Sequence, residues 1–264
     1  MTTIDLRRSD GLRKNRPYYE RYRPQSHWRT QEAEFDGAKF GMWLFLATEV
    51  LLFAGMFCGY AVFRMLYPQA WSNGSHYLDW RWGFLNTIVL LVSSFTVAMS
   101  IHNAQKNQQG WLRFNLLFTV ACAIAFVVIK LTFEYTPKWS GWFIFFDPTL
   151  QHYLHTDMDS GRTALGGLFH YIEGYGGKRP GALFRYAYAE SPYEHLWWSV
   201  YYVATGIHAT HVLIGVGLLS WLYMRARKLH FGPSHYTAVE IVGLYWHIVD
   251  MIWIFLFPLL YLIH

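Results

Sequence analysis

The chain has 264 residues, of which 53% are hydrophobic and 20% aromatic, while only 15% are charged. This composition excludes an ordinary soluble globular protein and is typical of an integral membrane protein. The formal charge of +5 does not indicate nucleic-acid binding, because nine of the 22 Lys and Arg residues precede residue 40, where six acidic residues are interleaved with them. Cys58 and Cys122 lie inside apolar segments, so we expect neither a disulfide nor a thiolate metal site.

The N-terminal segment, residues 1–35, is polar and rich in Arg, Tyr and Pro, so we expect an extended cytosolic tail there. Because it contains no apolar run, the first membrane helix, and not a cleavable signal peptide, is expected to direct insertion. Residues 36–264 are predicted to form one transmembrane domain.

Five apolar segments are long enough to cross a hydrocarbon core of about 30 Å as helices. The predicted spans are residues 40–63, 82–101, 114–133, 196–224 and 239–263. The predicted fold class is therefore all-α, a polytopic membrane protein with five transmembrane helices in a bundle. Residues 136–195 are polar apart from one short apolar run, so we expect an extramembrane insertion before the penultimate helix.

The distribution of basic residues predicts the orientation of the bundle. Nine Lys or Arg precede the first span, two lie in the 102–113 turn and three follow the fourth span, all on one side of a five-span chain. Loops rich in Lys and Arg stay in the cytosol, so the N-terminus is expected inside and the C-terminus outside.

Ionisable residues inside these spans are where function should be sought, because a charge at membrane depth is costly and normally faces protein or water. Glu49 lies near the middle of the first span. Lys130 stands four residues before Glu134 at the end of the third, so the two are expected to form an ion pair on one helix face at the membrane interface.

The last two spans carry five ionisable residues at helical spacing. They are His208, His211, Glu240, His247 and Asp250. Counting residues from the ends of the spans places both histidines of the fourth span and Asp250 of the fifth at similar depth if the helices are antiparallel neighbours. We therefore expect these side chains to form buried polar contacts between the helices.

Three functions are compatible with this pattern. Imidazoles and carboxylates on facing helices could hold iron or copper, although the usual Glu-x-x-His pair repeated on two helices is absent. A central carboxylate could serve an ion transporter, but the spans show neither an internal repeat nor paired broken helices. The third function is that of an accessory subunit whose polar residues bind neighbouring helices and lipid headgroups.

Six segments in chain order resemble subunit III of the haem-copper cytochrome c oxidases. They are GMWLFLATEVLLFAGMF, LNTIVLLVSSFTVAM, KLTFEY, ATGIHATHVLIG, RARKLHF and YWHIVDMIWIFLF. Together they cover all five spans, and the chain is similar to the shorter, five-helix bacterial type. Residues 137–190 are largely an insertion relative to that type.

The resemblance implies a non-catalytic subunit in a bacterial cytoplasmic (inner) membrane, packed against oxidase subunits I and II. It implies no cofactor on this chain, bound phospholipid, and haem and copper in the partner subunits. The enzyme as a whole would be a cytochrome c oxidase that couples oxygen reduction to proton translocation, and subunit III would stabilise the catalytic subunit and support proton uptake. Relatives of similar form belong to quinol oxidases and nitric oxide reductases, and these alternatives stay open.

The same resemblance implies roles for particular residues. Glu49 occupies the position of the family's buried, carbodiimide-reactive carboxylate, and Arg225 and Lys228 look like residues that meet lipid phosphate. The five ionisable residues of the last two spans look like the family's buried polar helix contacts. We further hypothesise that the 137–190 insertion contacts a cytochrome or another respiratory complex.

Overall fold

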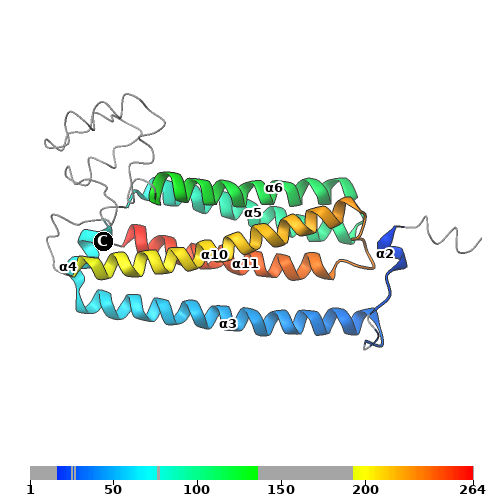
Figure 1. The fold of residues 1–264 in the computed structure, drawn as a ribbon, viewed down its shortest axis with the longest axis horizontal. Helices are drawn as coiled ribbons and strands as arrows, with labels where there is room; N and C mark the ends of the chain where they lie inside the picture. The colour runs from blue at the N-terminus through cyan, green and yellow to red at the C-terminus, as the bar shows by residue number, and fades with distance from the viewer. Residues whose placement is uncertain (1–16, 25, 27, 76–77, 136–192, 264) are drawn as a thin grey trace, which may run out of the picture. The chain divides into compact units, whose positions relative to one another are not determined.

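The computed structural model of the chain describes residues 17–24, 26, 28–75, 78–135 and 193–263. Five helices in these ranges are long and apolar enough to cross a membrane (Figure 1). They are α3 (Gln31–Leu66), α5 (Trp80–Gln105), α6 (Gln109–Ile129), α10 (Glu194–Arg227) and α11 (Thr237–Phe257). These helices confirm the predicted all-α fold with five spans.

Shorter helical segments flank the long ones. They are α2 (Tyr18–Arg21), α4 (Pro68–Ser75), and the π-helical turns η1 (Lys130–Tyr135) and η3 (Pro258–Leu262) that continue α6 and α11. The described ranges contain a single β-bridge, between Gly232 and His235, and no β-strand. Almost all of the predicted 136–195 insertion lies outside the described residues.

Helix α3 begins at Gln31, well before the predicted start of the first span at residue 40. Thr30 caps it, since the backbone N–H of Ala33 donates to the Thr30 hydroxyl at 3.1 Å. Glu32 and Glu34 lie in the first turn, where a negative charge interacts favourably with the helix dipole. Capping and charge therefore extend the helix into polar sequence that a hydropathy argument assigns to the tail.

The chain divides into two compact units, and each contains part of every long helix. The first comprises Met1–Leu52, Leu90–Ile124 and Thr210–Met251; the second comprises Phe53–Val89, Ala125–Ala209 and Ile252–His264. The first unit buries Leu112, Val212 and Trp246 completely, and the second does the same with Tyr201 and Trp253.

The long helices differ in how much of their apolar surface the chain itself covers. In its most apolar stretch, α11 has 56% of its residues buried, whereas α3 has 11%. Large apolar side chains such as Leu51 and Met65 on α3 are 71% and 76% exposed. An apolar surface of this kind needs lipid or another protein to cover it.

Candidate functional site

Glu49, the central carboxylate of the first span, is paired with a histidine. Its Oε2 atom lies 2.9 Å from Nε2 of His211 on α10, and each side chain is 15% exposed. The hydroxyl of Tyr245 on α11 donates to the backbone carbonyl of His211 at 2.9 Å. The pair therefore links three helices and gives a costly intramembrane carboxylate a hydrogen-bond partner.

Glu240, in the first turn of α11, also pairs with α3. Lys39 Nζ lies 2.6 Å from Glu240 Oε1 and 5.3 Å from the centre of the Phe35 ring. The ion pair is only partly buried, with the Lys39 side chain 38% exposed. Exposed and half-exposed pairs contribute little stability, so we expect the Lys39–Glu240 pair to add little to the free energy of unfolding.

His247 and Asp250 both face α5. The hydroxyl oxygen of Ser94 lies 2.6 Å from Nδ1 of His247. Asp250 is 3% exposed and lies beside Ser94, but neither carboxyl oxygen reaches hydrogen-bond geometry with a donor in the described residues. One turn of α11 thus presents an imidazole and a buried carboxyl group to one serine of α5.

His208 occupies an aromatic environment within the second unit. Its side chain is fully buried, with ring centres 5.6 Å from Phe126 and 5.1 Å from Trp253. The expectation from depth is contact among the five ionisable residues of the last two spans. The pairs observed for His211, Glu240 and His247 instead join α10 and α11 to α3 and α5, because rotation of each helix about its axis decides which neighbour a side chain meets.

Lys130 and Glu134 form an ion pair within η1, and their side chains are 3% and 5% exposed. The ion pair expected from the spacing of four residues is therefore present, and the chain itself encloses it. Tyr261 donates to the Glu134 carboxylate and accepts from Lys130, and the Tyr201 hydroxyl donates to the same carboxylate at 3.1 Å. The Lys130 ammonium group also lies 4.8 Å from the centre of the Trp253 ring.

The two tyrosines of this cluster were missed by the sequence reasoning. Tyr201 and Tyr261 lie 67 and 127 residues from Glu134, and nothing local marks them among the 19 tyrosines of the chain. Their hydroxyl groups let a buried carboxylate accept several hydrogen bonds, which is the condition for keeping an ion pair inside a protein.

Arg225 and Lys228 lie at the end of α10, where a positive charge interacts favourably with the helix dipole. The Arg225 guanidinium lies 4.9 Å from the centre of the Trp221 ring, and Lys228 is exposed. Trp rings are typical of the membrane interface, and the resemblance expects these two cations to meet lipid phosphate there.

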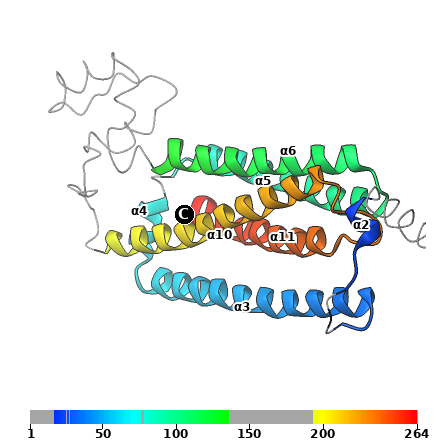
Figure 2. The same cartoon turned by 45° about the vertical axis from the view of Figure 1, so that its right-hand side comes forward.

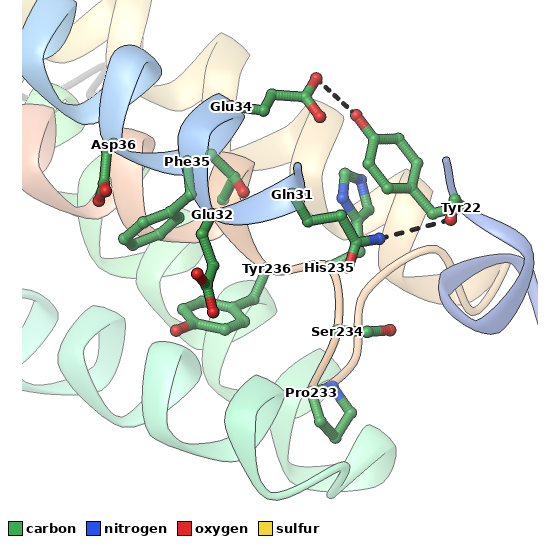
Figure 3. A pocket seen from close by; sticks show the side chains of 11 residues that line it. Tyr22, Gln31, Glu32, Glu34, Phe35, Asp36, Pro233, Ser234, His235 and Tyr236 are labelled. Atoms are coloured by element: carbon green, nitrogen blue, oxygen red, sulfur yellow. Dashed lines mark hydrogen bonds between the residues drawn. The ribbon is translucent and has the colours of Figure 1, made fainter. Parts of the chain in front are cut away.

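A cavity of about 480 Å³ lies between the start of α3 and the loop before α11 (Figure 3). Its lining includes the side chains of Glu32, Glu34 and Asp36. The Tyr22 hydroxyl donates to Glu34 Oε1 at 2.7 Å, as the dashed line in Figure 3 shows. Burial and this hydrogen bond raise the pKa of Tyr22 to about 12, so Tyr22 stays a hydrogen-bond donor at neutral pH.

The described residues also bear on metal binding. Within them, no three His, Cys, Asp or Glu side chains come together in an arrangement that could hold a metal ion. Two of the ion pairs described above, Glu49–His211 and Lys39–Glu240, instead join one helix to another.

Comparison with known proteins identifies the family. The sequence model described as cytochrome c oxidase subunit III matches residues 26–155 and 182–264. Between these ranges only residues 156–181 are unmatched, which is a shorter stretch than the 137–190 insertion expected from sequence.

Individual relatives agree with this match. Cytochrome c oxidase subunit 3 of Drosophila melanogaster is 25% identical, over 85% of this chain and 69% of its own. The bacterial subunit 3 of Corynebacterium diphtheriae is 25% identical and the probable subunit 3 of Nocardia farcinica 27%, each over 84% of this chain and 86% of its own. With most of the chain matched, the resemblance expected from sequence is confirmed: the chain belongs to the cytochrome c oxidase subunit III family.

Proposed function

We propose that the chain is the non-catalytic subunit III of a proton-pumping terminal oxidase in a bacterial cytoplasmic membrane. In this role it stabilises the subunits that carry haem and copper, supports proton uptake and binds phospholipid. The observation that carries the proposal is the exposure of α3. This helix leaves most of its apolar surface uncovered, and it also holds the Glu49–His211 pair. A helix of this kind is suited to packing against a larger membrane partner.

Glu49 is the residue we assign to proton uptake. Its carboxylate is 15% exposed and lies within hydrogen-bond distance of the His211 imidazole, at 2.9 Å. A carboxylate with such a partner can exchange a proton locally without leaving a bare charge in the membrane. The role concerns the proton supply of the neighbouring catalytic subunit, and no redox step is assigned to this chain.

Arg225 and Lys228 are the residues we assign to phospholipid. The Arg225 guanidinium lies against the Trp221 ring, and Lys228 is exposed on the turn that follows α10. Guanidinium groups bind phosphate through two parallel hydrogen bonds, and ammonium groups add attraction at short range.

The cytosolic position of the N-terminus is supported by contacts within the first unit. The Tyr19 backbone carbonyl accepts from Ser234 in the loop between α10 and α11, and its hydroxyl accepts from Asn107 in the turn between α5 and α6. The N-terminal segment and both connections therefore share one side. These are the same segments whose Lys and Arg content predicts the cytosol.

The test is purification of the tagged chain from native membranes in mild detergent, with identification of the co-purifying subunits and a visible absorption spectrum. We expect haem-bearing oxidase subunits to co-purify, and the haem type and copper content to separate a cytochrome c oxidase from a quinol oxidase or a nitric oxide reductase. The second measurement is a metal analysis of the chain after these partners have been removed. Stoichiometric iron or copper on the isolated chain would instead support a metal-binding oxidase, and absence of any haem subunit would favour an ion transporter.

A further inference from the structure

The segment just before α3 is held against the loop that joins α10 and α11 (Figures 1 and 2). We call residues 17–22 the strap. Ser234 Oγ donates to the Tyr19 carbonyl at 2.7 Å, and Asn107 Nδ2 donates to the Tyr19 hydroxyl at 3.1 Å. The Tyr19 ring fills the space beside Gly232, where an added Cβ would lie 2.6 Å from it. The loop is thus shaped to receive the strap.

Two tyrosines of the strap stack on two histidines of the loop. The rings of Tyr18 and His230 lie 4.2 Å apart at 25°, and those of Tyr22 and His235 lie 3.8 Å apart at 22°. His235 is one end of the Gly232–His235 bridge that closes the loop, and His230 lies two residues before the other end. The strap therefore rests on two groups whose charge changes within the physiological pH range.

We propose that the strap is a pH-sensitive latch, closed while His230 and His235 are neutral and released when they gain protons. The inference concerns this chain's own conformation and does not depend on the proposed function.

Positively charged side chains near His230 and His235 disfavour protonation of either ring. Arg225 faces both histidines, and Lys228 faces His230. His230 Nδ1 is buried without a hydrogen-bond partner among the described residues, so a proton there would have no acceptor.

Two contacts oppose release. Glu34 faces His235 and favours its charged form, and a tyrosine ring attracts a cation stacked on it. Burial, together with Arg225, nevertheless lowers the pKa of both His230 and His235 from the ordinary value of a histidine.

The direction of the pH effect follows from these lowered pKa values. The open strap binds protons with the ordinary histidine pKa of about 6.5, whereas the closed strap binds them less readily. Closure is therefore fully favoured above that pH and is lost as the pH falls through it. Each histidine changes the ratio of closed to open strap by up to about tenfold per pH unit in that range.

Release would also alter the cavity at the start of α3. Tyr22 lines this cavity and donates to Glu34, so a departing strap removes one wall and frees a carboxylate (Figure 3).

The test is a distance measurement on the full chain in lipid nanodiscs, with nitroxide labels at Glu20→Cys and Pro233→Cys. Both positions are exposed, and the natural Cys58 and Cys122 are replaced by Ser and Ala. At pH 8 we expect one narrow, short distance by pulsed electron spin resonance. At pH 5 we expect loss of that population and a broad, longer distribution.

The His230→Phe/His235→Phe variant keeps the aromatic stacks but cannot be protonated, so its short distance should persist at pH 5. His102→Phe, at an exposed histidine near the end of α5, is the matched control and should respond as the parent does. If the double Phe variant is already open at pH 8, the Arg225→Gln variant is the deciding test. Removal of the repelling charge should reduce the change in distance between pH 8 and pH 5. A parent distance that is the same at pH 8 and pH 5, or a response unchanged in the deciding variant, would overturn the proposal.

Discussion

Lys130 and Glu134 form a buried ion pair across one turn of the π-helical segment η1, with Tyr261 bridging the two charged groups. Removing one member leaves a desolvated charge, which costs more than the pair itself contributes. We expect Lys130→Met to lower the free energy of unfolding by about 3–5 kcal/mol. Thermal or denaturant unfolding of the chain in detergent measures this.

The matched control for that substitution is Lys106→Met, at an exposed lysine in the turn between α5 and α6. Its effect should stay within about 0.5 kcal/mol. The double variant Lys130→Met/Glu134→Leu removes both charges and should recover much of the lost stability. Equal losses for the buried and the exposed lysine would show that the pair is energetically unimportant.

The Glu49–His211 contact predicts different results for two substitutions of the carboxylate. Glu49→Gln keeps a side chain that can hydrogen-bond to the imidazole 2.9 Å away, so we expect normal assembly. Glu49→Leu leaves the His211 ring without that partner and should cost about 1–3 kcal/mol. Unfolding in detergent and yield of the assembled oxidase are the measurements.

Carbodiimide labelling tests the chemical character of the same carboxylate. We expect the parent chain to be labelled and Glu49→Gln to lose the label, as read by mass spectrometry of the α3 peptides. Glu240→Gln is the control, because Glu240 is also a carboxylate paired within the first unit but lies in the first turn of α11. Persistent labelling of Glu49→Gln would place the reactive carboxylate elsewhere.

Two glycines of α10 should respond oppositely to alanine. A Cβ at Gly215 would lie 2.5 Å from the fully buried Trp246 ring, whereas one at Gly217 would meet no atom within 4 Å. Gly215→Ala should therefore destabilise the chain by about 1–3 kcal/mol through overpacking. Gly217→Ala should be neutral or stabilising by up to about 1 kcal/mol. Thermal unfolding of the two variants side by side checks this, and similar values for both would contradict the close packing of α10 against Trp246.

The 137–190 segment is predicted to contact a partner outside the membrane. Replacing residues 140–188 with a short Gly-Ser linker should leave the oxidase subunits associated with the chain and remove the cytochrome or respiratory complex that co-purifies with it. The measurement is quantitative mass spectrometry of the complexes purified from a strain with the parent chain and from a strain with the replacement. A partner list that is unchanged by the deletion would remove this role.

The five apolar helices could be predicted from the sequence alone, because length and hydropathy are local properties that decide whether a segment can cross a membrane. The sequence also predicts the Lys130–Glu134 pair, since residues four apart on a helix are neighbours whatever the rest of the chain does. The family followed from the order of the six motifs, which the comparisons confirm. Helix α3 begins at Gln31, inside the segment expected to be an extended tail, because the Thr30 cap depends on hydrogen bonds that hydropathy does not register.

The helices that the polar side chains join could not be predicted without the packed structure. Glu49 and His211 are 162 residues apart, and Lys39 and Glu240 are 201 apart. Such pairs depend on the rotation of each helix about its axis, which the packing of all neighbours sets together and no local pattern encodes. The same holds for the strap, whose tyrosines meet histidines from the other end of the chain. Sequence therefore identified which residues are costly to bury, and the packing of the helices decided how each of those costs is offset.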